Sequence, residues 1–164
     1  MLRKAPFLLF VCAIVVGLCS CNGGTMYKKY ITIPESVWDV KSPITFTVPV
    51  KDTTNYYDIF VNVRNADGYD FSNLYLFIDV ASPMHTSERD TLECQLADPN
   101  TGKWMGDGLG DIWDNKILFK RNVRFPHSGN YIFTYTQAMR VDRLPLIMDI
   151  GLSIEPVKSQ AKTH

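Results

Sequence analysis

The chain has 164 residues and carries 17 Lys and Arg side chains against 17 Asp and Glu. Because nucleic-acid binding requires a basic surplus gathered on one face, this neutral balance argues against a nucleic-acid partner. With 46% hydrophobic and 21% charged residues, the composition is that of a globular protein, and we expect one compact domain. The aromatic fraction of 12% favours β-strands, since aromatic side chains pack well across a pleated sheet.

Residues 1–20 have the features of an export signal. Basic Arg3 and Lys4 precede a continuous apolar run over residues 7–18. As a helix, this run would extend about 18 Å, which is too short to cross the ~30 Å hydrocarbon core of a bilayer. The segment therefore predicts a cleaved signal peptide rather than a membrane span.

The signal ends in the pattern of a bacterial lipobox. Leu18 stands three positions before Cys21, and the small residue Ser20 directly precedes that cysteine. A lipobox predicts that Cys21 becomes the mature N-terminus and carries acyl chains, which anchor the protein to a membrane without spanning it. Residues 21–30 are then the lipidated N-terminus and a polar spacer. An ordinary secretory signal with incidental cysteines is the alternative.

Processing also determines the cysteine chemistry of the mature chain. Two of the four cysteines leave with the signal and acylation blocks Cys21, so Cys94 is the one thiol left and no internal disulfide can form. Cys94 alternates in phase with Leu92 and Leu96, which predicts a buried, inert thiol rather than a nucleophile. Residues 21–164 carry 15 basic and 17 acidic side chains, a net charge of −2.

Beyond the spacer, apolar and polar residues alternate with period two in six segments, which predicts β-strands. These segments are residues 44–50, 57–64, 74–81, 91–96, 131–136 and 148–155. Pro49 favours an edge position for the first segment, because proline cannot donate to a strand ladder. In 74–81 both phases are apolar for much of the length, which predicts a strand covered on both faces.

Turn-forming clusters of Asp, Asn, Pro, Ser and Gly separate these segments. Seven to nine short antiparallel strands without a long amphipathic helix predict an all-β fold, a two-sheet sandwich of the jelly-roll or immunoglobulin-like kind. We expect this domain to occupy residues 31–157, followed by a flexible tail at 158–164.

The sequence contains no arrangement typical of a catalytic, cofactor or metal site. His85, His127 and His164 lie in expected turns or the tail, and none has zinc-ligand spacing. The glycine-rich stretch 106–110 lacks the Lys-Ser or Lys-Thr pair of a phosphate-binding loop, and no serine nucleophile motif occurs. We therefore expect no enzymatic activity, no cofactor and no metal.

Calcium binds to loops that are rich in oxygen ligands, and four carboxylates lie within 17 positions of this segment. They are Asp98, Asp107, Asp111 and Asp114. Their spacing does not match an EF-hand loop, so solvated turn carboxylates are the favoured interpretation.

Residues 98–126 are the most distinctive segment, DPNTGKWMGDGLGDIWDNKILFKRNVRFP. Together with residues 89–97, 69–77 and 137–140 and the lipobox, this segment resembles the GldH family of gliding-motility lipoproteins of the Bacteroidetes. The resemblance covers nearly the whole chain. It implies an envelope lipoprotein required for surface gliding, which in this phylum is coupled to a dedicated protein-secretion machine. It implies no catalytic residue, and relatives also occur in bacteria that do not glide.

The loop around Trp104–Asp114 is the candidate interaction surface. Its glycines lose more backbone entropy on ordering than other residues, so a mere connection could be shorter. Trp104 and Trp113 supply contact area, and Asp107, Asp111 and Asp114 supply polar contacts at the rim. The alternative is that both tryptophans close one end of the sandwich and the glycines only permit tight turns.

The first functional hypothesis is therefore a lipid-anchored, non-catalytic component of the gliding or secretion apparatus, with other envelope proteins as partners and the outer membrane as the expected location. The alternative is a carbohydrate-binding module of the jelly-roll kind that stacks sugars on exposed aromatics, for which Trp38, Trp104, Trp113 and several tyrosines are available. Three solvent-facing aromatics in one shallow groove would favour a glycan. An exposed apolar strand edge would favour a protein partner.

Overall fold

The computed structural model describes residues 25–157, so the expected signal peptide, Cys21 and the C-terminal tail lie outside the described residues. Within this range the chain forms eleven β-strands and one turn of 3₁₀ helix, η2 (Pro34–Ser36). Five strands form one sheet, in the order β1 (Tyr27–Thr32), β11 (Ile147–Pro156), β4 (Tyr57–Ala66), β8 (Ile112–Val123) and β7 (Asp107–Leu109). Four strands form the other, in the order β3 (Ile44–Val50), β9 (Gly129–Gln137), β5 (Asn73–Ala81) and β6 (Ser87–Gln95). A small separate ladder pairs β10 (Arg143–Pro145) with β2 (Val37–Asp39).

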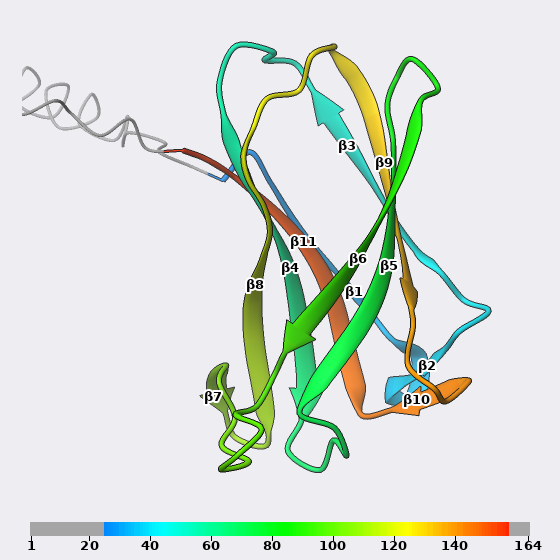
Figure 1. The fold of residues 1–164 in the computed structure, drawn as a ribbon, viewed down its shortest axis with the longest axis vertical. Coiled ribbons are helices and arrows are strands. Elements are labelled where there is room, and N and C mark those ends of the chain that lie inside the picture. The colour runs from blue at the N-terminus through cyan, green and yellow to red at the C-terminus, as the bar shows by residue number, and fades with distance from the viewer. Residues whose placement is uncertain (1–24, 158–164) are drawn as a thin grey trace, which may run out of the picture.

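The two sheets face each other as the layers of a sandwich (Figure 1). The eight long strands pair as nested antiparallel hairpins: β1 with β11, β3 with β9, β4 with β8, and β5 with β6. This nesting of first with last and second with second-last is the jelly-roll topology. The expected all-β sandwich is therefore confirmed, and of the two kinds considered it is the jelly roll.

Period-two alternation builds the core, because every second side chain of a strand points to the same face. In β3 all four apolar residues in phase with Phe46 are buried, while the threonines and Pro49 between them are exposed. Val61 of β4 and Leu152 of β11 are fully buried from the opposite sheet. Phe46 packs against Tyr135 with ring centroids 5.3 Å apart. The core is thus the layer between the sheets, closed without a disulfide.

All six segments predicted from alternation are strands, namely β3, β4, β5, β6, β9 and β11. The edge position predicted from Pro49 is confirmed, since β3 is the outermost strand of its sheet. The expected double-sided covering of 74–81 is wrong. Tyr75 and Phe77 on its outer face are 37% and 40% exposed, because no layer packs against that face within residues 25–157.

The expected spacer overlaps the first strand. Residues 27–30, assigned to the spacer from their polarity, belong to β1, which pairs with β11 from Tyr27↔Ile154 onward. Adjacent Lys28 and Lys29 hide the alternation of this short edge strand. Tertiary pairing with β11, rather than local pattern, fixes it in the sheet.

The longest strand, β8, is a second feature of the structure that the sequence did not predict. No period-two alternation predicts a strand within residues 98–126, yet residues 112–123 form β8 and pair along β4. A polar residue, Asn115, occupies a buried position where alternation calls for an apolar one. The register also shifts near Phe60 and Leu118, and such a bulge breaks the period-two pattern.

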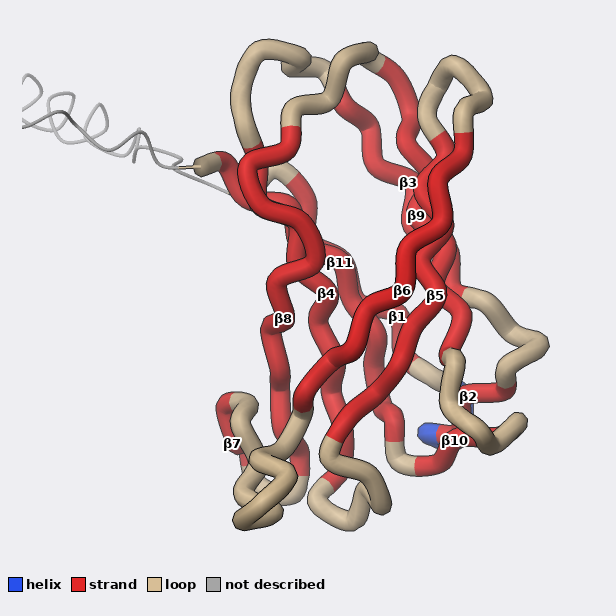
Figure 2. Tube along the Cα trace, in the orientation of Figure 1, coloured by secondary structure: helices blue, strands red, loops and turns tan. Residues whose placement is uncertain are grey.

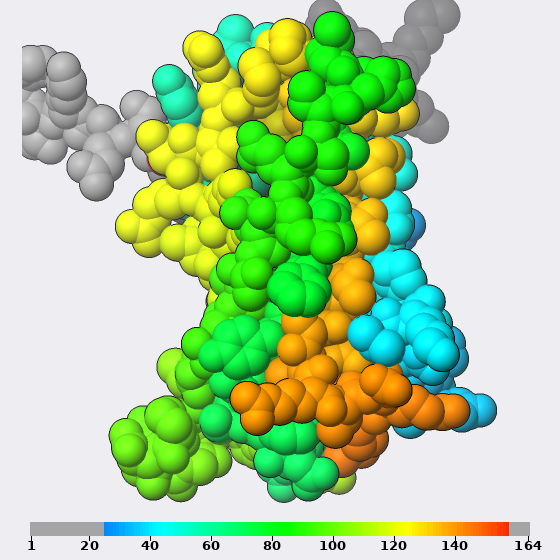
Figure 3. All heavy atoms as spheres, turned by 45° about the vertical axis from the view of Figure 1, so that its right-hand side comes forward, coloured from blue at the N-terminus to red at the C-terminus, as the bar shows by residue number. Residues whose placement is uncertain are grey.

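Loops lie at both ends of the sandwich, where the strands are connected (Figure 2). At the terminal end lie the start of β1, the end of β11 and the connections 51–56, 82–86 and 124–128. At the opposite end lies the long β6–β8 connection with β7, which we call the distal tip (residues 98–111). Figure 3 shows this tip as a lobe that protrudes from the lower left of the molecule.

Candidate functional site

The distal tip is an ordered loop that begins with a capped turn. The Asp98 carboxylate accepts hydrogen bonds from the backbone N–H groups of Asn100 and Thr101, each at 2.8 Å. These hydrogen bonds, that from Thr101 first, lower the pKa of Asp98 below its usual value. Gly102 closes the turn with a φ of 70°, a conformation that favours glycine. The carboxylate of Asp98 thus serves the fold of the loop.

Two tryptophans stiffen the tip from inside. The rings of Trp104 and Trp113 stack with centroids 6.3 Å apart and planes inclined by 28°. Both indole N–H groups donate to the same carboxylate oxygen of Asp67, at 2.8 and 3.1 Å. Asp67 belongs to the β4–β5 turn, so this contact ties two loops together. Both tryptophans are half-buried, which combines the structural role with a partly accessible surface.

Close packing explains two of the tip glycines. A Cβ at Gly108 would lie 2.9 Å from the Trp113 ring, and one at Gly106 would lie 2.7 Å from the side-chain oxygen of Asn115. Gly110 is different, because it has open space around it but a φ of 63°. The glycines therefore allow the loop to lie directly on Trp113 and Asn115.

The outer surface of the tip combines exposed apolar and acidic groups. Leu109 is 81% exposed, the highest value among the large hydrophobic residues of 25–157. Met105 is 63% exposed, which equals the value of Met84. Asp107 and Asp111 are exposed, and neither side chain makes a hydrogen bond or ion pair to residues 25–157. Leu109 and Asp107 lie on β7, the short edge strand of the five-stranded sheet. The tip thus offers a short strand edge with one exposed leucine, Leu109, flanked by the carboxylates of Asp107 and Asp111.

Asp114, the fifth residue of the expected surface, has a different environment. It lies opposite Asp107 in the β7–β8 ladder, but its carboxylate forms an ion pair with Arg64 at 2.9 Å and accepts from the Tyr30 hydroxyl at 3.1 Å. The Arg64 guanidinium lies 4.1 Å from the centre of the Tyr30 ring. Burial, and next to it the Asp114 charge, raises the pKa of Tyr30 to about 12. Asp114 therefore joins β8 to β4 and β1 across the outer face of the sheet.

Two other residues considered from the sequence lie in the core. Trp38 is only 1% exposed, and its indole N–H donates to the carbonyl of Ser42 at 3.0 Å. Cys94 is fully buried, as predicted, and burial raises the pKa of its thiol to about 12. Neither residue is available to a ligand at the surface.

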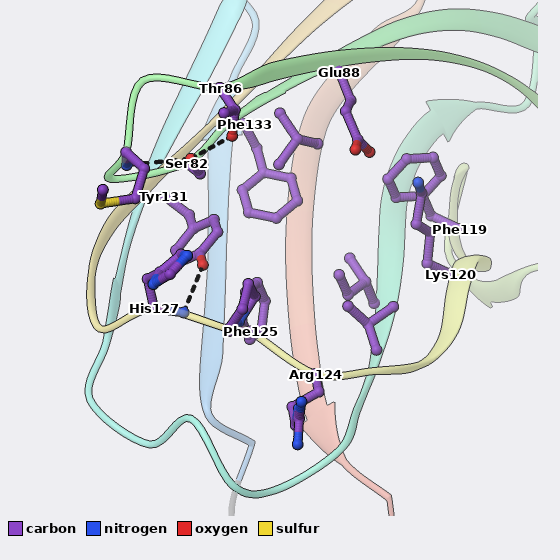
Figure 4. A pocket seen from close by; sticks show the side chains of 15 residues that line it. Ser82, Thr86, Glu88, Phe119, Lys120, Arg124, Phe125, His127, Tyr131 and Phe133 are labelled. Carbon is purple, nitrogen blue, oxygen red and sulfur yellow. Dashed lines mark hydrogen bonds between the residues drawn. The ribbon is translucent and has the colours of Figure 1, made fainter.

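A cavity of about 330 Å³ lies at the terminal end, and no feature of the sequence predicts it. Figure 4 shows aromatic rings of Phe119, Phe125, Tyr131 and Phe133 around it. These residues come from β8, the β8–β9 connection and β9, with β4 and β5 completing the wall. Only tertiary packing brings them together, so no local motif could have revealed the site.

The comparisons with known proteins agree with the resemblance noted in the sequence. The family model of the GldH lipoprotein matches residues 25–154, which include all of β1 to β10 and nearly all of β11. This chain belongs to the GldH lipoprotein family. The matched range contains both the distal tip and the cavity.

Two relatives match this GldH-family chain over most of its length. A protein of Christiangramia forsetii named "Gliding motility lipoprotein GldH homolog" is 36% identical over 160 residues, covering 93% of this chain and 97% of the relative. The "Gliding motility lipoprotein GldH" of Flavobacterium johnsoniae is 36% identical over 159 residues, covering 93% and 96%. A chain from the "Structure of infectious bursal disease virus Gx strain" aligns with a TM-score of 0.30 and 10% identity, over 85% of this chain and 31% of that one.

Membership of a lipoprotein family means that a lipid anchor holds the protein at a membrane of the cell envelope. Residues 25–157 contain no helix of the length and apolarity that a membrane crossing requires. The same residues contain no group of three His, Cys, Asp or Glu side chains arranged to hold a metal ion.

Proposed function

We propose that this protein is a non-catalytic envelope lipoprotein that presents its distal tip to another protein of the gliding or secretion apparatus. The observation that carries the proposal is the exposed edge strand β7, with Leu109 81% exposed at its end. An unpaired strand edge can add a strand of a partner, and an exposed leucine gives that partner an apolar contact. The names of the two relatives supply the gliding context.

The stiffness of the tip supports binding over mere connection. A loop that is ordered before it binds loses little conformational entropy in the complex. Here the Trp104–Trp113 stack and the shared Asp67 carboxylate fix the loop, while Asp107 and Asp111 stay free at its surface. The tryptophans therefore serve as the support and the residues outside them as the contact surface.

The tip also lies at the end of the sandwich that faces away from the expected membrane anchor. We propose that Cys21, which lies outside the described residues, carries the lipid anchor. It precedes Tyr27, the first residue of β1, by six positions, a reach of about 20 Å at most. Strands such as β4, with 10 residues, are about 33 Å long, so the tip lies a sandwich length away from the anchored end.

The glycan alternative has less support. Stacking of a sugar chain on three aromatics is excluded for the set Trp38, Trp104 and Trp113, because Trp38 is buried. The other two stack on each other, and their N–H groups are bound to Asp67. The apolar strand edge at Leu109 favours a protein partner instead.

The decisive experiment replaces the free groups of the tip without touching its support. We expect Asp107→Ala with Asp111→Ala, and separately Leu109→Lys, to abolish gliding or secretion and to remove a protein crosslinked to the tip in envelope membranes. The melting temperature should stay within about 2 °C of the wild type, as for surface substitutions generally. The matched control is Asp70→Ala with Asp142→Ala, two exposed carboxylates at the same end of the sandwich.

Full function in the tip variants would reject the tip as the binding surface. Loss of function accompanied by a large loss of stability would assign the tip a structural role.

The anchor is tested separately. Cys21→Ser should remove labelling by a fatty-acid probe and release the protein from membranes. Unchanged labelling would reject Cys21 as the attachment site.

A further inference from the structure

The cavity at the terminal end is apolar inside. Phe125 and Phe133 are 3% and 1% exposed, and they face the cavity together with Ile59 and Val80 from the two sheets. Polar groups at its edge are already paired: the Tyr131 hydroxyl accepts from the backbone N–H of His127, and the hydroxyls of Ser82 and Thr86 bond to each other. The interior therefore matches a hydrocarbon ligand rather than a polar one.

The cavity is open because two strand edges diverge there. β6 is the outermost strand of its sheet and pairs only with β5. In the other sheet β7 covers the outer edge of β8 only over residues 112–114, and no ladder joins the rest of this edge to β6. Among the described residues, one ion pair joins these two strands: Lys120, at the edge of the cavity, pairs with Asp90 at 2.7 Å. Figure 4 shows free space between the aromatic rings on the two sides. A linear chain can enter from the side without unfolding either sheet.

The mouth of the cavity carries charges of both signs. Glu88 and Lys120 lie on the same side of it, and Arg124 extends away from its centre (Figure 4). Such a rim is complementary to a head group that itself carries both signs: Glu88 can accept from an ammonium, and the ammonium of Lys120, which pairs with Asp90, has further N–H donors for a phosphate. A purely anionic head group would meet the carboxylate of Glu88.

The position of the mouth identifies where such a ligand comes from. The cavity is lined by Val123 and Phe125, at the same end of the sheet as Tyr27 and Val157. With Cys21 acylated, the six positions from Cys21 to Tyr27 reach about 20 Å at most, so the membrane surface lies near the end of the sandwich at which the cavity opens. The surrounding bilayer is therefore the nearest source of acyl chains.

From these observations we infer that the cavity holds one acyl chain of a zwitterionic phospholipid taken from the membrane to which the protein is anchored. The chain lies among the rings of Phe119, Phe125 and Phe133, and the head group meets Lys120 and Glu88 at the mouth. This inference rests on the proposed anchor only for its account of where the lipid comes from. It gives the lipoprotein a second, non-covalent contact with its membrane.

The first experiment uses the full-length acylated protein in vesicles of phosphatidylethanolamine whose acyl chain carries a diazirine. After illumination, mass spectrometry should place the crosslinks on residues 119–133. Val80→Phe, which fills the cavity, and Thr86→Phe, which covers its mouth, should each reduce these crosslinks at least tenfold. The matched control Thr53→Phe lies at the same end outside the cavity and should leave them unchanged.

The second experiment separates the cavity from the anchor. Full-length Cys21→Ser protein is titrated with dihexanoyl phosphatidylethanolamine below its micelle concentration, and the methyl and ring NMR signals of Ile59 and Phe133 are followed. We expect saturable shifts that Thr86→Phe abolishes, and Glu88→Gln should remove the preference over dihexanoyl phosphatidylglycerol. This readout is unaffected if Cys21 proves not to be the anchor.

Two results would overturn the inference. One is the absence of saturable shifts in the titration. The other is crosslinking that falls on the 51–56 connection and does not change in Thr86→Phe, since this pattern reports only nearness to the bilayer. Thr86 is exposed, so its replacement keeps the test decisive even if Val80→Phe fails to fold.

Discussion

Cys94 illustrates how a residue that looks reactive becomes inert through its position. It is fully buried in β6, opposite Leu74 of β5, and burial raises the pKa of its thiol to about 12. The thiolate, which is the reactive form, is therefore absent at neutral pH. Cys94 acts as a small hydrophobic residue of the core.

We predict that the native protein resists thiol reagents at Cys94 and reacts only when it unfolds. Cys94→Ala should lower the free energy of unfolding by about 1 kcal/mol, as small truncations in a core do. Labelling of a variant in which Cys12, Cys19 and Cys21 are all replaced by Ser, at increasing urea concentration, measures both quantities. Rapid labelling without urea would contradict the burial of this side chain.

Asp67 is the residue that holds the tip, and we predict that Asp67→Ala loosens it. Two indole N–H groups lose their common acceptor, at a cost of about 1 kcal/mol because Asp67 itself is exposed. The fluorescence of Trp104 and Trp113 should shift to longer wavelength as both rings become more hydrated. Asp70→Ala in the same turn is the control, and an equal shift there would assign the effect to the turn as a whole.

At the scale of elements, the tip glycines give two different predictions. Gly108→Ala places a methyl group against the Trp113 ring, so we expect a loss of about 2 kcal/mol and altered tryptophan fluorescence. Gly110→Ala meets no neighbour and only imposes a left-handed conformation on alanine, at about 1 kcal/mol with unchanged fluorescence. Thermal unfolding followed by fluorescence distinguishes them. Identical behaviour would refute the close packing of β7 on Trp113.

The strands differ in how well their sequences predicted them. In β3 and β4 alternation places every buried apolar residue in phase, so the pattern alone defined the strands. In β8 a buried Asn115 and a bulge interrupt the pattern. Asn115 is acceptable there because its side-chain amide donates to the carbonyl of Val63 and to Asn65, both on β4. Such compensation depends on a neighbouring strand and has no local signature.

At the scale of the whole molecule, stability should fall in acid. Hydrogen bonds from Thr54 and Asn55 lower the pKa of Asp52 to about 2, while those from Arg89 and from Thr101 lower the pKa values of Asp79 and Asp98. A carboxyl group with a lowered folded-state pKa stabilises the fold above its unfolded value of 3.8. This contribution disappears as the pH falls from about 4 to about 2.

We therefore predict that these groups contribute a constant amount to the free energy of unfolding between pH 5 and pH 7, and that this contribution declines below pH 4. Urea unfolding at pH 5, 4, 3 and 2.5 measures the decline. Asp52→Ala should make it shallower and leave its onset unchanged. A decline that begins above pH 5 would indicate that other groups control the acid stability.

Like the strands, the residues of the candidate site differ in whether the sequence could predict them. Trp104, Trp113, Asp107 and Asp111 could be selected from the sequence, because an ordered glycine-rich loop with large aromatics has a composition that local reasoning can detect. Asp67 could not, since it reaches the two tryptophans from 37 and 46 residues away. Asp114 was assigned to the tip from its position in the chain, and the contact with Arg64 assigns it to the sheet face.

The sequence by itself determined the all-β class, the six alternating strands, the buried thiol at Cys94 and the family, because each of these depends on local periodicity or on the order of short motifs. Only the tertiary structure decided that the sandwich is a jelly roll, that the tip lies at the end opposite the start of β1 and the end of β11, and that an apolar cavity opens beside those strand ends. These features arise from pairing between strands far apart in the chain. The free energy of such pairing comes from buried surface shared by distant segments, which no local pattern records.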